Sequence, residues 1–217
     1  QAMEAQRARA RASTKFTATE ATRFSPRTDD DLASLTDTFV GYTDTKSHSK
    51  VEHLFRTDGT ATAMLESGEK GFAILDRTSF YLEAGGQVSD TGCLSTADNR
   101  KSVAQVDRVE RLGQSGPRVH HVHVKSGQFG VGDVVSANVD HERRDAIRRN
   151  HTATHLLHAV LRAHLGTHVK QAGSLVAPDR LRFDFAHDGP ISLDTLAGIE
   201  RDVNKHIYSN KSIETEI

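Results

Sequence analysis

The sequence predicts an α+β protein in which a small antiparallel β-barrel is followed by an α+β part. Three observations support this fold class. Short apolar runs recur between residues 36 and 140, turn signals separate them, and the periodicity becomes helical after residue 140. At 217 residues, the chain is long enough for one large or two small domains. We therefore divide it into residues 1–35, 36–140 and 141–217.

The two ends of the sequence suggest a fragment of a longer chain. Residues 1–13 are rich in Ala, Arg and Gln, which favour a helix, and no N-cap residue precedes them. Residues 17–31 are polar and predict an irregular connection. Residues 211–217 alternate as in a half-buried strand, with Ile213, Thr215 and Ile217 on one face. The alternative is a chain whose outer residues are simply disordered.

The first large part contains seven β-type runs. They are residues 36–42, 50–55, 60–65, 71–75, 102–108, 119–124 and 133–139. Turn signals such as Asp58–Gly59 lie between them. Short strands at this spacing are typical of a small antiparallel barrel or sandwich, and we expect the barrel.

The second part alternates helix and strand. Asp140 is a good N-cap for a helix that we expect to run to about residue 165, where Gly166 ends it. Residues 181–185 alternate as a strand. Ser192 is expected to cap a second helix, whose apolar face carries Leu193, Leu196, Ile199, Val203 and Ile207.

Composition limits the classes of function. The chain has 28 Lys and Arg against 29 Asp and Glu, so any site for a polyanion must be local. Cys93 is the single cysteine and cannot form an internal disulfide, which favours a reducing, cytoplasmic compartment. No apolar run approaches the roughly 20 residues that a membrane span needs, and no secretory signal opens the chain. The 13 histidines are unusually many.

The first predicted helix carries a stripe of histidine and arginine. Its apolar side contains Ala153, Leu156, Leu157 and Val160. Nearly opposite, an arc of roughly 80° contains Arg144, Arg148, His151, His155, His158 and Arg162. His151 and His155 are one turn apart, so their imidazoles can converge on one ion, and zinc suits them best. The arginines would favour phosphates, so the stripe fits a substrate with a metal-seeking group and a phosphodiester.

Simpler interpretations remain open for the histidines. The stripe could be a solvated polar face, because two histidines alone hold zinc weakly. The available third ligands are His158, His168, His187, Asp184 and Cys93, each of which has an ordinary structural alternative. In the predicted strand 119–124, the residues His120, His121 and His123 favour surface or cross-strand contacts over metal binding.

Five segments contain recognisable motifs in a fixed order. They are residues 75–81 (LDRTSFY), 83–87 (EAGGQ), 148–158 (RRNHTATHLLH), 165–176 (LGTHVKQAGSLV) and 181–185 (LRFDF). Together they closely resemble the editing region of bacterial alanyl-tRNA synthetases, and residues 1–13 resemble the end of the helix that precedes it. The resemblance covers essentially the whole chain.

The resemblance implies hydrolysis of tRNA(Ala) that carries serine or glycine by mistake. It implies a fold of the second-additional-domain type of threonyl- and alanyl-tRNA synthetases. His151 and His155 would bind zinc, and Thr154 and Gln171 would lie in the editing pocket. Gly85, Gly86 and Gln87 match the motif that lines or supports this pocket, and we assign tRNA contacts to Arg144, Arg148 and Arg162. The implied partners are the acceptor end of tRNA(Ala) and the rest of an ATP-using synthetase.

This sequence departs from the family pattern in its zinc ligands. The family completes the zinc shell with a later Cys-x-x-x-His pair, which these 217 residues lack. We therefore expect weak or no metal binding and poor deacylation. The editing cleft is expected between the two parts, with the stripe facing it. The alternatives are a non-catalytic tRNA-binding module and a free-standing editing hydrolase. Locally, Thr154 could bond its own helix and Gln171 could be an ordinary turn residue.

Overall fold

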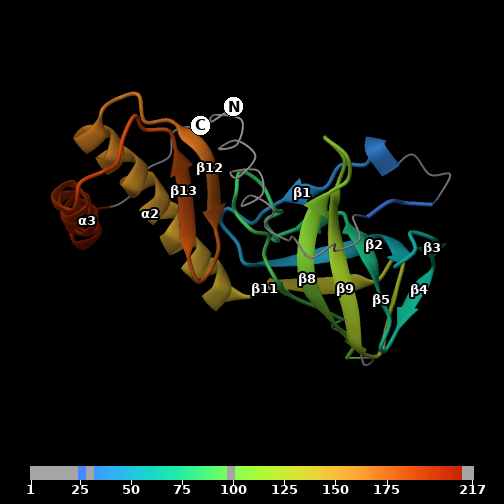
Figure 1. The fold of residues 1–217 in the computed structure, drawn as a ribbon. Coiled ribbons are helices and arrows are strands. Elements are labelled where there is room, and N and C mark those ends of the chain that lie inside the picture. Colours follow the sequence, from blue (N-terminus) through green and yellow to red (C-terminus); the bar gives the residue numbers. More distant parts are fainter. Residues whose placement is uncertain (1–23, 28–31, 97–100, 212–217) are drawn as a thin grey trace, which may run out of the picture.

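A computed structural model describes residues 24–27, 32–96 and 101–211 of the chain (Figure 1). A barrel forms one part, and two helices with a β-hairpin form the other (Figure 1). The helix predicted for residues 1–13, most of the connection 17–31 and nearly all of the strand predicted at 211–217 lie outside the described residues.

Six antiparallel strands close into the barrel. In spatial order they are β11 (Val134–Val139), β7 (Gly92–Thr96), β8 (Val103–Arg111), β9 (Arg118–Ser126), β5 (Lys70–Leu75) and β2 (Lys46–Arg56). β11 also pairs with β2, so the sheet closes on itself and these strands have no free edge. The shorter elements are η1 (Leu32–Ser34), β1 (Thr38–Phe39), β3 (Ala61–Thr62), β4 (Met64–Glu66), β6 (Arg77–Thr78) and β10 (Gln128–Gly130).

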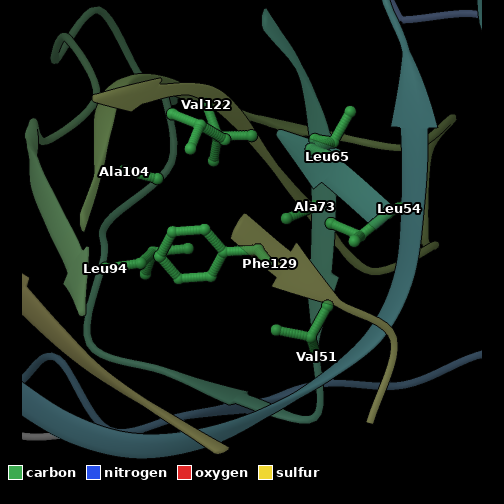
Figure 2. A pocket seen from close by; sticks show the side chains of 9 residues that line it. Val51, Leu54, Leu65, Ala73, Leu94, Ala104, Val122 and Phe129 are labelled. Carbon is green, nitrogen blue, oxygen red and sulfur yellow. The ribbon is translucent and has the colours of Figure 1, made fainter. Parts of the chain in front are cut away.

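The barrel interior is a packed core. Apolar side chains from several strands point inward, and Phe129 lies between Leu94 and Val51 in the close-up view (Figure 2). The remaining cavity measures about 10 Å³ and is lined only by apolar side chains. A space of this size and polarity holds no ligand, so the chemistry must lie outside the barrel lumen.

The second part is built on a long helix. α2 (His141–Leu165) begins after Asp140, whose carboxylate accepts a hydrogen bond from the Arg143 backbone N–H at 3.0 Å. The antiparallel strands β12 (Gln171–Val176) and β13 (Leu181–Phe185) pack against it, as does α3 (Leu193–Tyr208). Val160 and Leu161 of α2 meet Ile199 of α3 in a separate apolar core. Neither of these two helices has the length and apolar character needed to cross a membrane.

The structure confirms the α+β class, the barrel and both helices with their N-caps, but several elements differ from expectation. The run at 36–42 forms only the two-residue β1. β7 and β12 were not predicted, because GCLST and QAGSLV combine glycine with few β-branched residues. The predicted apolar face of α3 is only partly buried. Ile199 is in the core, whereas Leu193, Leu196 and Ile207 are exposed.

His120 of β9 is a structural residue of the barrel. Its ring is fully buried, lies 2.9 Å from the Thr78 Oγ1 and 3.2 Å from the Ala73 carbonyl oxygen, and packs on Phe80. Burial disfavours the charged imidazolium and lowers the pKa of His120 from 6.5 to about 4. The ring is therefore neutral in the folded protein at physiological pH.

The depressed pKa of His120 predicts a loss of stability in acid. The unfolded chain binds a proton near pH 6.5 and the folded chain only near pH 4. The contribution of neutral His120 to the free energy of unfolding is therefore complete above pH 6.5. As the pH falls toward 4, this free energy decreases by up to about 3 kcal/mol. Urea unfolding across this range should show the loss. His120→Gln should flatten the curve, whereas His48→Gln, at an exposed position of β2, should not. Equal slopes for all three proteins would contradict the assignment.

Candidate functional site

The buried face of α2 differs from the predicted one. It contains Arg144, Ile147, Thr154 and Leu161, at steps of three and seven residues. Val160 and Leu157 also pack inward, as expected. In contrast, Ala153 and Leu156 line an open groove beside the end of α3. The stripe is therefore not the main core-facing side of α2, as predicted, except for Arg144. The predicted apolar arc is only partly buried, because the buried face lies between the two arcs.

His151 and His155 lie on the exposed side of α2 and point toward each other. Their Nε2 atoms are 3.2 Å apart and their ring centroids 4.9 Å apart. At zinc–nitrogen distances of about 2.0–2.1 Å, this separation corresponds to an angle of about 100° at one ion. Partial burial and the neighbouring His155 lower the pKa of His151, which favours the neutral, metal-binding form. The pair fits two adjacent positions of a tetrahedral zinc site.

The other candidate ligands lie elsewhere. His158 packs on Phe183 and lies 3.4 Å from the Val169 carbonyl oxygen. His168 stacks on His187, with 3.0 Å between their nearest ring nitrogens. Asp184 pairs with Arg182, and Cys93 belongs to β7 of the barrel. Within residues 24–27, 32–96 and 101–211, no three His, Cys, Asp or Glu side chains form a group that could hold a metal ion.

Strand β12 runs beside the histidine segment. Just before the strand, the Val169 carbonyl oxygen lies 3.4 Å from the His158 Nε2. Just after the strand, the Ala177 carbonyl accepts a hydrogen bond of 2.7 Å from the Asn150 side chain. β12 is therefore antiparallel to α2 and lies alongside the turns that carry the histidine pair. Gln171, at the start of β12, is exposed, and its Nε2 donates to the Ser174 Oγ at 3.1 Å.

The glycine-rich loop docks on the same strand. The Ser174 hydroxyl donates to the Gly85 carbonyl at 3.2 Å, and the Val176 N–H donates to the Gly86 carbonyl at 2.8 Å. Gln87 forms an isolated parallel bridge with Val176. The fold thus brings Gly85, Gly86 and Gln87 next to the strand of Gln171, although they are about 85 residues apart in sequence.

The Thr154 hydroxyl bonds the backbone of its own helix, which was the alternative to a role in the editing pocket. Its side chain is buried, and its Oγ1 donates to the Asn150 carbonyl of the preceding turn at 2.7 Å. Threonine in a helix commonly satisfies its hydroxyl in this way. Of the two predicted pocket residues, only Gln171 therefore has an exposed side chain.

Arg144 is not part of the exposed stripe, and its assignment to tRNA binding is contradicted. The residue is 5 % exposed and forms a buried ion pair with Asp90. Its Nε donates to the Asp90 Oδ1 at 2.8 Å, and its Nη atoms donate to the carbonyls of Gly41 and Ser79, each at 2.8 Å. These bonds use its hydrogen-bonding capacity inside the protein. Arg148 and Arg162, by contrast, are exposed.

Sequence reasoning missed two residues that organise this region. Asp90 is almost completely buried beneath α2, and Ser174 joins Gln171 to the glycine-rich loop. Ser174 lies three residues after Gln171 in the segment 165–176, so this spacing could have indicated a contact between the two side chains. Nothing local indicated Asp90, because an aspartate between strands usually predicts a turn.

The chain, with its barrel and its helix carrying a convergent histidine pair, also matches a known protein family in sequence. Residues 1–143 match the family model described as tRNA synthetases class II (A). The chain therefore belongs to the class II (A) tRNA synthetase family.

Among its relatives are alanine–tRNA ligases from three bacteria. The chain is 45% identical to that of Rhodopseudomonas palustris over 219 residues, which cover 100% of this chain and 24% of the relative. Identity to the Pseudoalteromonas translucida enzyme is 42% over 93% of this chain and 22% of the relative. Identity to the Bordetella avium enzyme is 41% over 100% of this chain and 23% of the relative. The chain thus spans about a quarter of the length of these relatives.

The docking of the glycine-rich loop predicts different effects for its two glycines. Gly86 has φ +86°, and an added Cβ would lie 2.4 Å from the Ser174 Oγ and 2.5 Å from its carbonyl oxygen. Gly85 has φ +61°, and its Cβ would meet nothing within 4 Å. Gly86→Ala should lower the free energy of unfolding by about 1–3 kcal/mol. Gly85→Ala, the matched control, should cost about 1 kcal/mol or less. Equal costs in urea unfolding would contradict this docking.

Proposed function

We propose that this chain is the editing part of an alanyl-tRNA synthetase and hydrolyses the ester of Ser-tRNA(Ala) or Gly-tRNA(Ala). The observation that carries the proposal is the convergence of His151 and His155 on the exposed side of α2, beside the strand that begins with Gln171. The similarity to alanine–tRNA ligases along the chain supports the same assignment. The proposed partner is the remainder of a cytoplasmic synthetase.

The proposed reaction is attack of water on an aminoacyl ester. The chain's residues must hold the ester, orient the water and recognise the wrong amino acid. His151 and His155 are the residues that would hold zinc, which supplies Lewis-acid chemistry to the ester when bound. The two described ligands fill half of a tetrahedral shell, so we expect weak metal binding by the chain alone.

Selection of serine over alanine is assigned to Gln171. The Nε2 of its amide is bonded to the Ser174 hydroxyl, which leaves the Oε1 as a hydrogen-bond acceptor. A serine hydroxyl can donate to this oxygen, whereas alanine has no donor. A site built to bond a hydroxyl disfavours the analogue that lacks it.

A non-catalytic tRNA-binding module is the second candidate. Two observations favour it: Thr154 bonds its own helix, and no third ligand accompanies the histidine pair in the described part of the chain. This candidate keeps the exposed Arg148 and Arg162 as phosphate contacts. It predicts binding of tRNA without turnover.

Deacylation of Ser-tRNA(Ala) with and without added zinc separates the two candidates. For the editing enzyme, we expect slow hydrolysis that zinc accelerates. His151→Ala should reduce the zinc-dependent rate at least about 100-fold, as the loss of a key catalytic group commonly does. His141→Ala is the matched control, because His141 is an exposed histidine of the same helix.

The outcomes are distinct. A rate that survives loss of His151 would defeat metal-dependent editing. Binding of tRNA without turnover, even in a longer chain that includes the Cys-x-x-x-His pair, would favour the binding module. A calorimetric zinc titration of the wild-type and His151→Ala chains checks metal binding independently of turnover.

A further inference from the structure

Tyr42 is a large aromatic side chain that the protein presents to solvent in a fixed position. It is 75 % exposed, and its ring contacts Phe39 edge-on, with centroids 5.0 Å apart. Phe39 is supported in turn by Tyr81 and by the Arg118 guanidinium, which lies 4.3 Å from the Phe39 ring centroid. Arg118 is itself held by Asp37 at 2.7 Å. Most of the Tyr42 ring is therefore open to solvent, while its inner side rests on an ordered cluster.

The backbone that carries Tyr42 is equally well anchored. Buried Arg144 donates to the carbonyl of Gly41, and the Asp44 N–H closes a turn on the Val40 carbonyl at 3.1 Å. An added Cβ at Gly41 would lie 2.3 Å from the Ser79 carbonyl oxygen, so the turn is pressed against the barrel. A rigid aromatic surface loses little entropy when a ligand stacks on it.

Tyr42 lies at the start of the exposed stripe on α2. The Arg148 Nη2 lies 3.5 Å from the Tyr42 carbonyl oxygen, so the side chain of Arg148 reaches the Tyr42 turn. Arg148, His151 and His155 share an arc of about 60° on the helix, and Arg148 is about 5 Å along the axis from His151. The turn that carries Tyr42, the exposed guanidinium of Arg148 and the histidine pair thus follow one another, and the part from Arg148 to His155 covers about two turns of the helix.

This order matches the end of a single-stranded nucleic acid that carries an ester. Sequence-tolerant sites for single strands combine stacking on aromatic rings with basic residues along the backbone. Arg148 is also 3.9 Å from Asp145, but this exposed ion pair is weak and leaves the guanidinium available to a phosphate. Within one terminal nucleotide, the base and the esterified ribose hydroxyl are closer together than Arg148 and His155, which are about 10 Å apart along the helix axis. The base at Tyr42 would therefore belong to the nucleotide before the terminal one, with the phosphate that joins the two nucleotides at Arg148.

We propose that Tyr42 is the stacking surface for a base at the unpaired 3′ end of the aminoacylated tRNA and that Arg148 contacts its phosphate. The proposal rests on the proposed function, because it places the ester at the histidine pair. It adds a substrate-binding residue from the barrel to a site that otherwise belongs to α2 and β12.

The test measures binding of an RNA hairpin with a four-nucleotide unpaired 3′ end in which the nucleotide before the terminal one carries 2-aminopurine. Stacking on Tyr42 should quench the fluorescence of this base. Tyr42→Ala should weaken binding about 5- to 100-fold and abolish the quenching, and Tyr42→Phe should retain both within about twofold. Tyr208→Ala is the matched control, since Tyr208 is 84 % exposed at the end of α3. Arg148→Ala should reduce the slope of log affinity against log salt by about 0.7.

The hairpin carries no amino acid, so this result does not depend on turnover. Equal affinity and quenching for wild type and Tyr42→Ala would overturn the proposal, even if His151→Ala abolishes deacylation. An effect of Tyr42→Ala that Tyr42→Phe reproduces would also overturn it, because the aromatic ring would then not be the binding element. Thermal unfolding of each variant confirms that the fold is retained. Tyr42-dependent binding together with His151-independent deacylation would support this proposal and defeat metal-dependent editing.

Discussion

A buried ion pair connects the two parts of the molecule. Arg144 lies in the first turns of α2, and its guanidinium bonds Asp90 together with the carbonyls of Gly41 and Ser79. Asp90 also accepts the Tyr81 N–H at 2.6 Å. Burying two charges is costly unless they are paired and their hydrogen bonds are satisfied, and this network meets both conditions. It fixes the start of α2 against three barrel segments, and every site residue beyond it is positioned from that point.

The site is then built from rigid elements rather than from mobile loops. α2 sets the spacing of the histidine pair, because residues one turn apart point in the same direction. β12 runs antiparallel to the helix and brings Gln171 and Ser174 alongside. The glycine-rich loop is bonded to β12 by Gly85 and Gly86. Only the loop contact joins segments that are far apart in sequence, 89 residues between Gly85 and Ser174, so the barrel is what brings this loop to β12.

Local signals in the sequence were sufficient for part of this arrangement. The helix caps at Asp140 and Ser192, five of the six barrel strands and the spacing of His151 and His155 depend on neighbouring residues only, and the structure contains all of these. The burial of Arg144 could not be predicted, because its partners are contributed by the barrel 54 to 103 residues away. The helical wheel placed Arg144 on the same arc as the histidine pair but could not show that the barrel covers the N-terminal end of this arc. β12 was missed for a similar reason, since its pairing with β13 compensates for a weak strand sequence.

The near-neutral charge of the chain bears on how such a site would hold tRNA. With 28 basic and 29 acidic residues, the molecule exerts no strong long-range attraction on a polyanion. Because Arg144 is buried, Arg148 and Arg162 are the arginines of the stripe that remain on the exposed surface. Phosphate contacts would then be few, and affinity for a single strand would depend on stacking and on the ester. For the proposed editing role, this balance would suit a site that samples many correctly charged tRNAs and releases them, because electrostatic contacts would bind all tRNAs alike whereas the amino acid alone would distinguish the wrong one.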